Sequence, residues 1–454
     1  MAAMNVPVQK PLWQRFLLFL APLMLSNILQ SLSGTINSIY VGQLIGVDAL
    51  AAMSVFFPIM FLLIGFIVGL ASGATILVGQ AWGARNLVKI KEVTGTTLTT
   101  SLLAGIGVAL VGVLFAHNVM ELLGAPPDII DLAAAYGRVM LLGMPPFFVF
   151  LVLTSMLRGV GDTMTPLITL GISVALGLVI TPALIQGWFG LPQIGPLAAA
   201  VAFILGTLAV LVFCAFYLRW RKSPLALDRE QLHHLRIDVK LLAMILRLGV
   251  PAGVSMVVAS LSGLVIVGLV NRFGSEATAA FGAVNQVMSY VQFPAMSLMI
   301  ASSIFAAQAI GARRMDEVEH VTRTGLFMNL VITGGLVLLA YLFSEHIVRL
   351  FITSEEVVEM TETLLHIVLW AVVMSGFGGV FSAVMRASGD VWIPMALSLT
   401  AIIAVEIPSA LLLSRFIGLH GIWIAYCLSF CSLLALQAGY YLLFWRRKEI
   451  RALV

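Results

Sequence analysis

Two short stretches decide the fold of this chain, because each of them occurs twice. Gln80-Ala81-Trp82-Gly83-Ala84-Arg85 returns 228 positions later as Gln308-Ala309-Ile310-Gly311-Ala312-Arg313. At the same offset, Arg158, Gly161, Asp162 and Pro166 return as Arg386, Gly389, Asp390 and Pro394. All four stretches lie between long apolar runs. Duplicated loops in an apolar chain indicate a membrane transporter built from two equivalent halves.

The composition confines the chain to the membrane class. Of its 454 residues, 61% are hydrophobic and 10% are charged, whereas a soluble domain carries about 25% charged residues. The apolar runs are continuous and long enough to cross roughly 30 Å of hydrocarbon as helices, which excludes a barrel of short alternating strands. The expected spans are residues 16–41, 49–78, 93–116, 130–156, 164–187, 195–218, 243–270, 277–307, 322–343, 357–385, 392–415 and 418–445.

The repeat divides these spans equally. We expect an all-α membrane protein with twelve transmembrane helices in two six-helix lobes, residues 1–218 and 241–454, joined by a cytoplasmic linker at 219–240. Because six is even, both lobes begin on the same side of the membrane. The pseudo-two-fold axis that relates them therefore lies along the membrane normal.

Basic residues set the expected orientation. With the N-terminus inside, 21 of the 25 Lys and Arg residues fall in inside segments, as the positive-inside rule requires. We therefore expect a multi-pass protein of a bacterial or archaeal cytoplasmic (inner) membrane, with both termini cytoplasmic and no cleaved signal peptide. The same bias accounts for the net charge of +4, so no nucleic-acid partner is expected.

The duplicated loops both lie on the predicted inside. Gly83 and Gly311 are expected to end their helices in a left-handed conformation. Aspartates 162 and 390 follow the loop arginines by four residues, close enough to pair with them. We interpret these residues as fold and gating elements, with substrate contact as the alternative. The gating candidates are Arg85, Arg313, Arg158, Asp162, Arg386 and Asp390.

These motifs in combination resemble the multidrug and toxic compound extrusion (MATE) family. The similarity rests on Gly79–Asn86, on Pro22–Met24 with Asn37–Leu44, on Arg158–Thr163 with Pro166, and on Arg386–Asp390 with Pro394. The major facilitator superfamily also has six plus six spans, but its loop motif differs. The chain looks closest to the prokaryotic DinF-like branch. The resemblance implies export of organic, often cationic, compounds, driven by a proton or sodium gradient through alternating access of two lobes.

One departure concerns ion coupling. The DinF-like pattern has an aspartate in the first helix, but the matching residue here is Asn37, whose amide does not titrate. Glu406 is the one acidic residue well inside an expected span. We expect Glu406 to take up a proton, with His366 or Arg138 at similar depth to balance its charge. A structural carboxylate beside Pro408 is the alternative, as are neutral oxygens near Asn37 that bind sodium.

Three helix faces are candidates for the substrate cavity, and plain interior packing is the alternative for each. Asn27, Gln30 and Asn37 share one face of the first span, at spacings of three and seven. The eighth and tenth spans carry polar, methionine and aromatic stripes that suit varied apolar or cationic ligands. These stripes are Asn285, Ser289, Gln292, Met296 and Met299, and His366, Trp370, Met374, Phe377 and Phe381.

The sequence therefore predicts a secondary active exporter of amphipathic or cationic small molecules, surrounded by membrane lipids and monomeric. No cofactor is expected beyond H⁺ or Na⁺ as coupling ion, and the three cysteines are expected to be inert thiols without metal. Without a phosphate-binding Gly-Lys-Ser/Thr loop, ATP drive is not expected. The rival hypotheses are a flippase for a lipid-linked oligosaccharide, a membrane-embedded enzyme and a channel.

Overall fold

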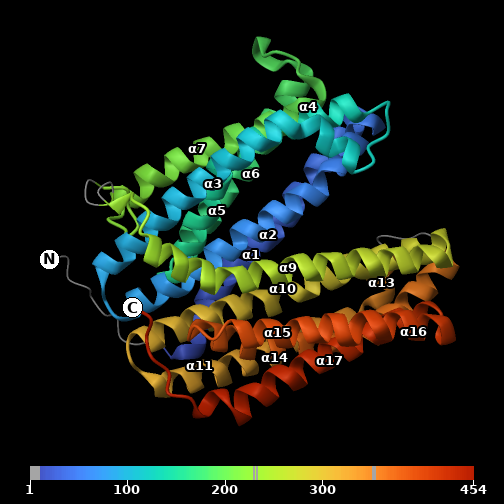
Figure 1. The fold of residues 1–454 in the computed structure, drawn as a ribbon. Coiled ribbons are helices and arrows are strands. Elements are labelled where there is room, and N and C mark those ends of the chain that lie inside the picture. Colours follow the sequence, from blue (N-terminus) through green and yellow to red (C-terminus); the bar gives the residue numbers. More distant parts are fainter. Residues whose placement is uncertain (1–10, 229–230, 232–233, 350–353) are drawn as a thin grey trace. The chain divides into compact units, whose positions relative to one another are not determined.

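The structure is a computed structural model that describes residues 11–228, 231, 234–349 and 354–454. In these residues the chain forms only helices and the turns that join them (Figure 1). Eleven of the described helices are long and apolar enough to cross a membrane, and the bent pair α4–α5 supplies a twelfth span. The predicted all-α membrane architecture is confirmed, although most helices extend a few residues beyond the expected span ends.

The helices alternate with short connections. They are α1 (Leu12–Leu44), α2 (Val47–Gly83), α3 (Leu87–Leu122), α4 (Ile130–Leu142), α5 (Met144–Gly159), α6 (Met164–Gln186), η1 (Trp188–Gly190), η2 (Gly195–Leu197), α7 (Ala198–Trp220), α9 (Val239–Val270), η3 (Asn271–Phe273), α10 (Ser275–Gly311), α11 (Met315–Met328), η4 (Asn329–Thr333), α12 (Gly334–Leu342), α13 (Ser344–Arg349), α14 (Glu355–Ala387), α15 (Trp392–Thr400), η5 (Ala401–Glu406), α16 (Ile407–Ile417), α17 (Leu419–Leu443) and η6 (Trp445–Arg447).

The chain divides into two compact units, and the division falls inside α1 and α9. We call Leu25–Gly253 the N-unit, and Met1–Met24 with Val254–Val454 the C-unit. In the C-unit, Phe16 of α1 packs on Phe305 of α10 with ring centroids 4.8 Å apart. In the N-unit, a Cβ added at Gly249 of α9 would lie 2.2 Å from the carbonyl oxygen of Gly69. Each leading helix thus begins in the unit formed mostly by the other half of the sequence.

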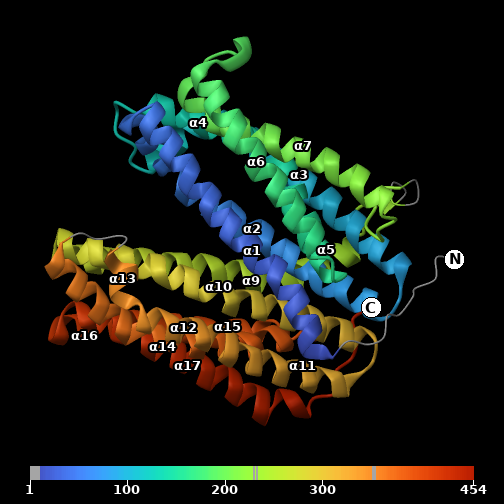
Figure 2. The same ribbon diagram turned by 180° about the vertical axis from the view of Figure 1, so that it is seen from behind.

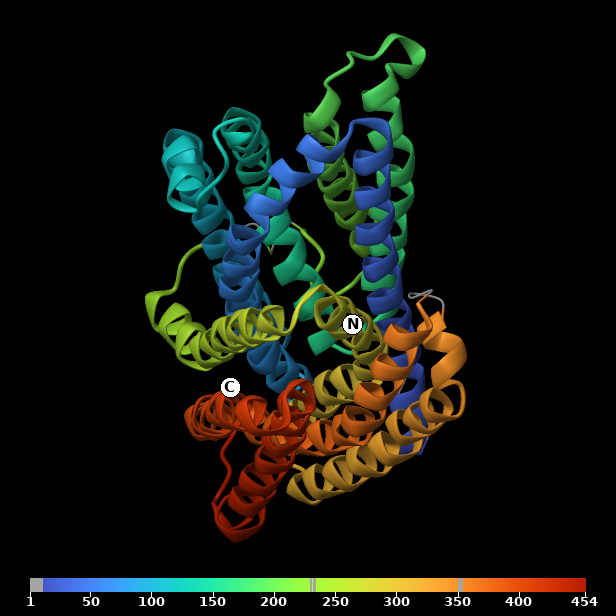
Figure 3. The ribbon, with the colours of Figure 1, turned by 90° about the vertical axis from the view of Figure 1, so that its right-hand side faces the viewer.

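The N-unit contains the broken span. Helices α4 and α5 meet at an angle of 49°, and Pro145 and Pro146 open α5. Proline lacks the N–H that would continue the helical hydrogen bonds of α4, so the span bends at this point. The unit also pairs α6 with α7 and packs α3 against both parts of the broken span. Figure 3 shows the α6–α7 connection, with η1 and η2, projecting past the ends of these helices.

The C-unit differs from its repeat partner in two ways. Its counterpart of the broken span, α14, is continuous and packs along α10 and α17 (Figure 2). Two of its spans contain a π-helix instead, η4 and η5. At η4 the buried Asn329 donates from Nδ2 to the carbonyl of Val373 in α14, 2.9 Å away. Single π-turns inside α-helices often mark functional sites, and η5 ends at Glu406.

The predicted linker packs on α3. Leu225 and Gln231 are fully buried, and Gln231 donates from Nε2 to the carbonyl of Lys91, 3.1 Å away. Lys91 also forms an ion pair of 3.2 Å with Asp228. The backbone approaches α3 so closely that a Cβ at Gly95 would lie 1.9 Å from the carbonyl oxygen of His234. The described part of the linker is therefore a docked segment and not a freely solvated loop.

Candidate functional site

Glu406 lies buried inside the C-unit, with 6% of its surface exposed. Ser262 of α9 donates its hydroxyl to Oε1 at 2.6 Å, and Ser429 of α17 donates to Oε2 at 2.9 Å. A hydrogen bond to an ionised group contributes about 1.5–3 kcal/mol. Two such bonds are enough to offset the roughly 2.5–3.5 kcal/mol that insertion scales assign to a charge at the centre of a membrane helix. The site therefore supports a carboxylate within a span.

The local sequence explains why Glu406 faces inward. It is the last residue of η5, and Pro408, which follows in the first turn of α16, has no N–H to donate to the preceding turn. The Ile407 N–H reaches back to Ile402 across the wider π-turn. The hydroxyl of Ser429 also lies 3.3 Å from the carbonyl oxygen of Ala401, at the start of η5. The wide turn thus presents both a side-chain and a backbone oxygen to α17.

The two basic residues expected beside Glu406 have other surroundings. His366 Nε2 lies 3.0 Å from the hydroxyl of Ser344 and 3.8 Å from Glu362, and its ring stacks on Tyr341. Arg138 is exposed on α4 of the N-unit. The sequence did not indicate the two serines that contact Glu406, because Ser262 and Ser429 lie 144 and 23 residues away from it along the chain.

The predicted polar face of the first span makes a longer polar contact, at Asn37, than the contacts that surround Glu406. Asn37 is half-buried, and its Oδ1 accepts a long contact of 3.5 Å from the hydroxyl of Thr181 in α6. Gln30 is exposed and Asn27 is half-buried. The Asn37–Thr181 pair joins the first and fifth spans of the N-terminal half, as Ser262–Glu406 does in the other half. Only the second pair includes an acid.

The stripes predicted on the eighth and tenth spans are partly exposed on adjacent helices. Met296 of α10 is 48% exposed and Trp370 of α14 is 42% exposed. The two helices meet beside the stripes, where a Cβ at Gly379 would lie 3.2 Å from the sulfur of Met299. Ser289 is also exposed, whereas Phe381 is buried in the core. The exposed or half-buried members are Asn285, Ser289, Gln292, Met296, Met299, His366, Trp370, Met374 and Phe377.

The first duplicated loop is a helix C-cap in both halves. Helices α2 and α10 end at Gly83 and Gly311, as predicted. The left-handed residues are nevertheless Arg85 and Arg313, with φ of 56° and 57°, so the prediction of left-handed glycines is wrong. The N–H of Asn86 donates to Ala81, which is the long-range bond of a Schellman cap. The repeat thus preserves two identical helix ends.

The second duplicated loop is used differently in the two halves. Asp162 accepts hydrogen bonds from the N–H and hydroxyl of Thr165, so it satisfies a donor in the first turn of α6. Asp390 instead binds Lys448 at 2.8 Å and the Tyr440 hydroxyl at 3.0 Å. Among the described residues, the predicted pairing of these aspartates with Arg158 and Arg386 is therefore wrong. The Lys448–Asp390 contact raises the pKa of the lysine and ties the C-terminal segment to the loop.

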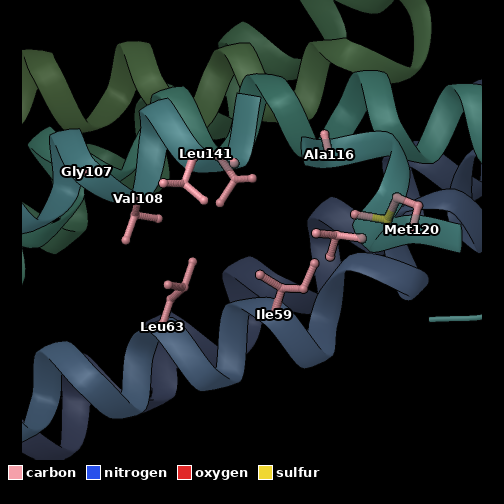
Figure 4. A pocket seen from close by; sticks show the side chains of 10 residues that line it. Ile59, Leu63, Gly107, Val108, Ala116, Met120 and Leu141 are labelled. Carbon is pink, nitrogen blue, oxygen red and sulfur yellow. The ribbon is translucent and has the colours of Figure 1, made fainter. Parts of the chain in front are cut away.

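The N-unit contains an apolar cavity of about 340 Å³ between α2, α3 and α4. Figure 4 shows hydrocarbon side chains and the Met120 thioether around it. A ligand site needs a few polar groups to fix orientation, so this cavity is a weak candidate for recognition of a cation. Its lining is Ile59, Leu63, Gly107, Val108, Val111, Gly112, Ala116, Val119, Met120 and Leu141.

Among the described residues, no three or more His, Cys, Asp or Glu side chains cluster in a way that suits a metal. Cys214 and Cys427 are buried and Cys431 is half-buried, all as free thiols. The Cys427 thiol contacts the carbonyl of Ile367 at 3.1 Å. The site around Glu406, with one carboxylate and neutral oxygens, is of a different kind from a multi-carboxylate metal centre.

Comparisons with known proteins agree with this architecture. The MatE family model matches residues 22–183 and 251–412, one match in each half. The chain is 44% identical to the probable multidrug resistance protein YoeA of Bacillus subtilis, over 97% of this chain and 96% of that protein. It is 25% identical to the multidrug export protein MepA of Staphylococcus aureus, over 96% and 95%.

Solved structures show the same fold. The Vibrio cholerae MATE transporter VcmN in its bent form superposes with a TM-score of 0.86 at 22% identity, covering 95% of this chain and 96% of that one. An outward-facing multidrug resistance MATE transporter gives a TM-score of 0.85 at 21% identity, with 94% of each chain covered. The two family matches and the 44% identical relative lead to one conclusion: this chain belongs to the MATE family of multidrug efflux transporters.

Proposed function

We propose that this protein is a secondary active exporter of amphipathic and cationic small molecules, coupled to inward movement of H⁺ or Na⁺ through Glu406. The observation that carries the coupling is the buried Glu406 carboxylate held by two serine hydroxyls on other helices. A membrane-embedded carboxylate is costly, and such groups characteristically serve ion pathways. In the N-unit the corresponding spans are joined by the amide of Asn37 and the hydroxyl of Thr181.

The substrate surface in this proposal is the exposed face of α10 and α14 in the C-unit, while Asn27 and Gln30 of α1 are separate candidate contacts in the N-unit. Trp370 offers an aromatic face to a cation, and Met296 offers a flexible, polarisable contact to varied apolar shapes. The amides of Asn285 and Gln292 add hydrogen-bonding groups. Such a surface suits several ligands of one broad class better than a single ligand.

Transport in this proposal proceeds by alternating access. Helices α1 and α9 run from one compact unit into the other, and Pro22 and Pro251 lie within a few residues of the division. Proline weakens a helix locally and allows it to bend. The duplicated loops around Arg85, Arg158, Arg313 and Arg386 would then shape the cytoplasmic gate, with the protein monomeric in an inner membrane and both termini cytoplasmic.

Dye efflux from proteoliposomes tests the proposal. Wild type and Glu406→Gln are compared under an imposed proton gradient and, separately, an imposed sodium gradient. We expect gradient-driven export of a fluorescent cation in the wild type and its loss in the variant, because glutamine keeps the size of the side chain but carries no negative charge and takes up no proton. Unchanged export by Glu406→Gln would return Glu406 to a structural role.

The orientation has its own test. In a background without the native cysteines, a cysteine at Ser223 should react with an impermeant thiol reagent only from inside. A cysteine at Ser275 should react only from outside. The reverse pattern would contradict the proposed topology.

A further inference from the structure

We infer that Glu406, Ser262, Ser429 and the carbonyl of Ala401 form a binding site for a single Na⁺ ion inside the C-unit. This inference deepens the proposed coupling and rests on it, because it assigns the ion that Glu406 carries. The site is built from three separate segments of the C-unit: α9, η5 and α17.

The oxygens that define the site are connected in one chain of contacts. Ser262 Oγ lies 2.6 Å from Glu406 Oε1, and Ser429 Oγ lies 2.9 Å from Oε2. Ser429 Oγ also lies 3.3 Å from the carbonyl oxygen of Ala401. Two carboxylate oxygens, two hydroxyls and one carbonyl thus gather at one buried place. Hydroxyls that now donate to the carboxylate can rotate and offer their lone pairs to a cation.

The charge of the site selects a monovalent ion. Glu406 supplies one negative charge, and both serines and the Ala401 carbonyl are neutral. One monovalent cation leaves the buried site neutral, whereas a divalent ion would leave an uncompensated charge away from water, which is costly. The donors are all hard oxygens, which suit a hard cation and not a soft transition metal. The contacts of 2.6 and 2.9 Å are hydrogen bonds between oxygens, so these oxygens must separate slightly to admit any cation, and a small ion such as Na⁺ requires less separation than a larger one.

The number of oxygens favours Na⁺ over a proton. A proton needs the carboxylate and one acceptor, but here oxygens from three segments converge on the same carboxylate. The π-helix η5 adds to this supply, since its wider turns alter the regular pairing of backbone carbonyls. Interrupted helices whose backbone carbonyls turn toward an ion are a recurrent way to hold a cation in transporters.

The corresponding place in the N-unit lacks these features. Asn37 brings no negative charge, and its Oδ1 lies 3.5 Å from the Thr181 hydroxyl. Helix α6 is a continuous α-helix from Met164 to Gln186, without a π-turn. The two halves share the pairing of the first span with the fifth, but only the C-unit has both the charge and the additional oxygens.

Sodium binding can be measured without transport. The purified protein is heated in NaCl, in KCl and in choline chloride at equal ionic strength, because an ion that binds only the folded state raises Tm. We expect Tm to rise with Na⁺ concentration in the wild type and not in Glu406→Gln. Ser262→Ala and Ser429→Ala should weaken Na⁺ binding about tenfold or more. Ser260→Ala is the matched control, since Ser260 of α9 is exposed and donates to the carbonyl of Met256 in its own helix.

Each outcome has a distinct meaning. A sodium-dependent rise that vanishes in Glu406→Gln and persists in Ser260→Ala supports the site, provided all variants elute as monodisperse peaks. No rise in the wild type, an equal rise with KCl, or a rise retained in Glu406→Gln overturns it. If Na⁺ has no effect but proton-driven export is still lost in Glu406→Gln, the coupling role stands and the sodium assignment fails. If Na⁺ binds as expected but no dye is exported, the site stands and the proposed function fails.

Discussion

Replacing Gly95 with valine should release the linker from α3. A Cβ at this position would lie 1.9 Å from the carbonyl oxygen of His234 and 2.5 Å from its carbonyl carbon. Backbone atoms cannot move aside as a side-chain tip can, so the linker must shift. Overpacking of this kind costs about 1–3 kcal/mol.

The contacts that dock the linker on α3 contribute a free energy comparable to the cost of this clash. The clash should therefore shift the linker towards its undocked state. Four contacts between described residues hold the linker on α3: Gln231 with Lys91, Asp228 with Lys91, the Thr96 hydroxyl with the carbonyl of Arg236, and the Asp238 N–H with the Thr96 hydroxyl. At about 0.5–1.5 kcal/mol each, they sum to a few kcal/mol. A loss of about 1–3 kcal/mol therefore raises the population of the undocked linker about 5- to 150-fold.

Limited trypsin cleavage after Arg236 measures this population, because cleavage follows the open fraction when opening is fast. The cleavage rate should rise by the same factor in Gly95→Val. The control is Gly107→Val in the same helix, where an added Cβ meets no atom within 4 Å. A cleavage rate in Gly95→Val equal to that of the wild type and the control would refute the reasoning.

Three further predictions concern the linker, the helix caps and the C-terminal segment. The N–H of Gln231 and the ammonium of Lys91 hold the pKa of Asp228 below its ordinary value of 3.8. The ionised Asp228 therefore stabilises the docked linker above pH 3.8, and this stabilisation is lost as the pH falls through the lowered pKa. Amide exchange at residues 234–238, corrected for intrinsic rates, should accelerate in that pH range in the wild type. The same measurement on Asp228→Asn should show no such step. Arg85→Gly should raise stability by about 1 kcal/mol by removing the cost of a left-handed residue, seen as a higher Tm, whereas Arg85→Val should lower it. Trp445 is 3% exposed, and its indole N–H donates to the Ser388 hydroxyl at 3.2 Å. Trp445→Ala should therefore destabilise the packing of the C-terminal segment by about 3–5 kcal/mol and speed amide exchange at residues 444–454. Trp392→Ala, at a residue that is 47% exposed, should change this exchange little.

The sequence predicts the spans well because each depends on a local property, the length of an apolar run. It does not predict how a span is interrupted. Pro145 and Pro146 open a separate helix, α5, and bend the fourth span by 49°, whereas α9 continues through Pro251. The π-helices η4 and η5 have no local signature at all. Their geometry depends on packing against neighbouring helices, such as the bond from Asn329 to α14.

The candidate site was predictable only in part, for a related reason. Glu406 is identified by composition, since an acid within an apolar run is rare. Its partners are set by three-dimensional contacts, and a search for titratable neighbours overlooks serines. The expectation of His366 as a partner rested on equal depth in the membrane, but depth does not fix the direction in which a helix faces. His366 contacts Ser344 and Glu362 instead.

The repeat places the buried carboxylate of the second half in a pairing that has a counterpart in the first half. Ser262–Glu406 and Asn37–Thr181 both join the first and fifth spans of their half, and each pair is 144 residues apart. In the first half, the leading helix contributes Asn37, whose amide is neutral, and the fifth span contributes the Thr181 hydroxyl. In the second half, the fifth span contributes the carboxylate of Glu406, and the leading helix contributes the Ser262 hydroxyl. The fold therefore provides one polar pairing per half, and a charged group can occupy either helix of the pair. What the C-unit adds is η5 and Ser429, and the proposed ion site rests on these features.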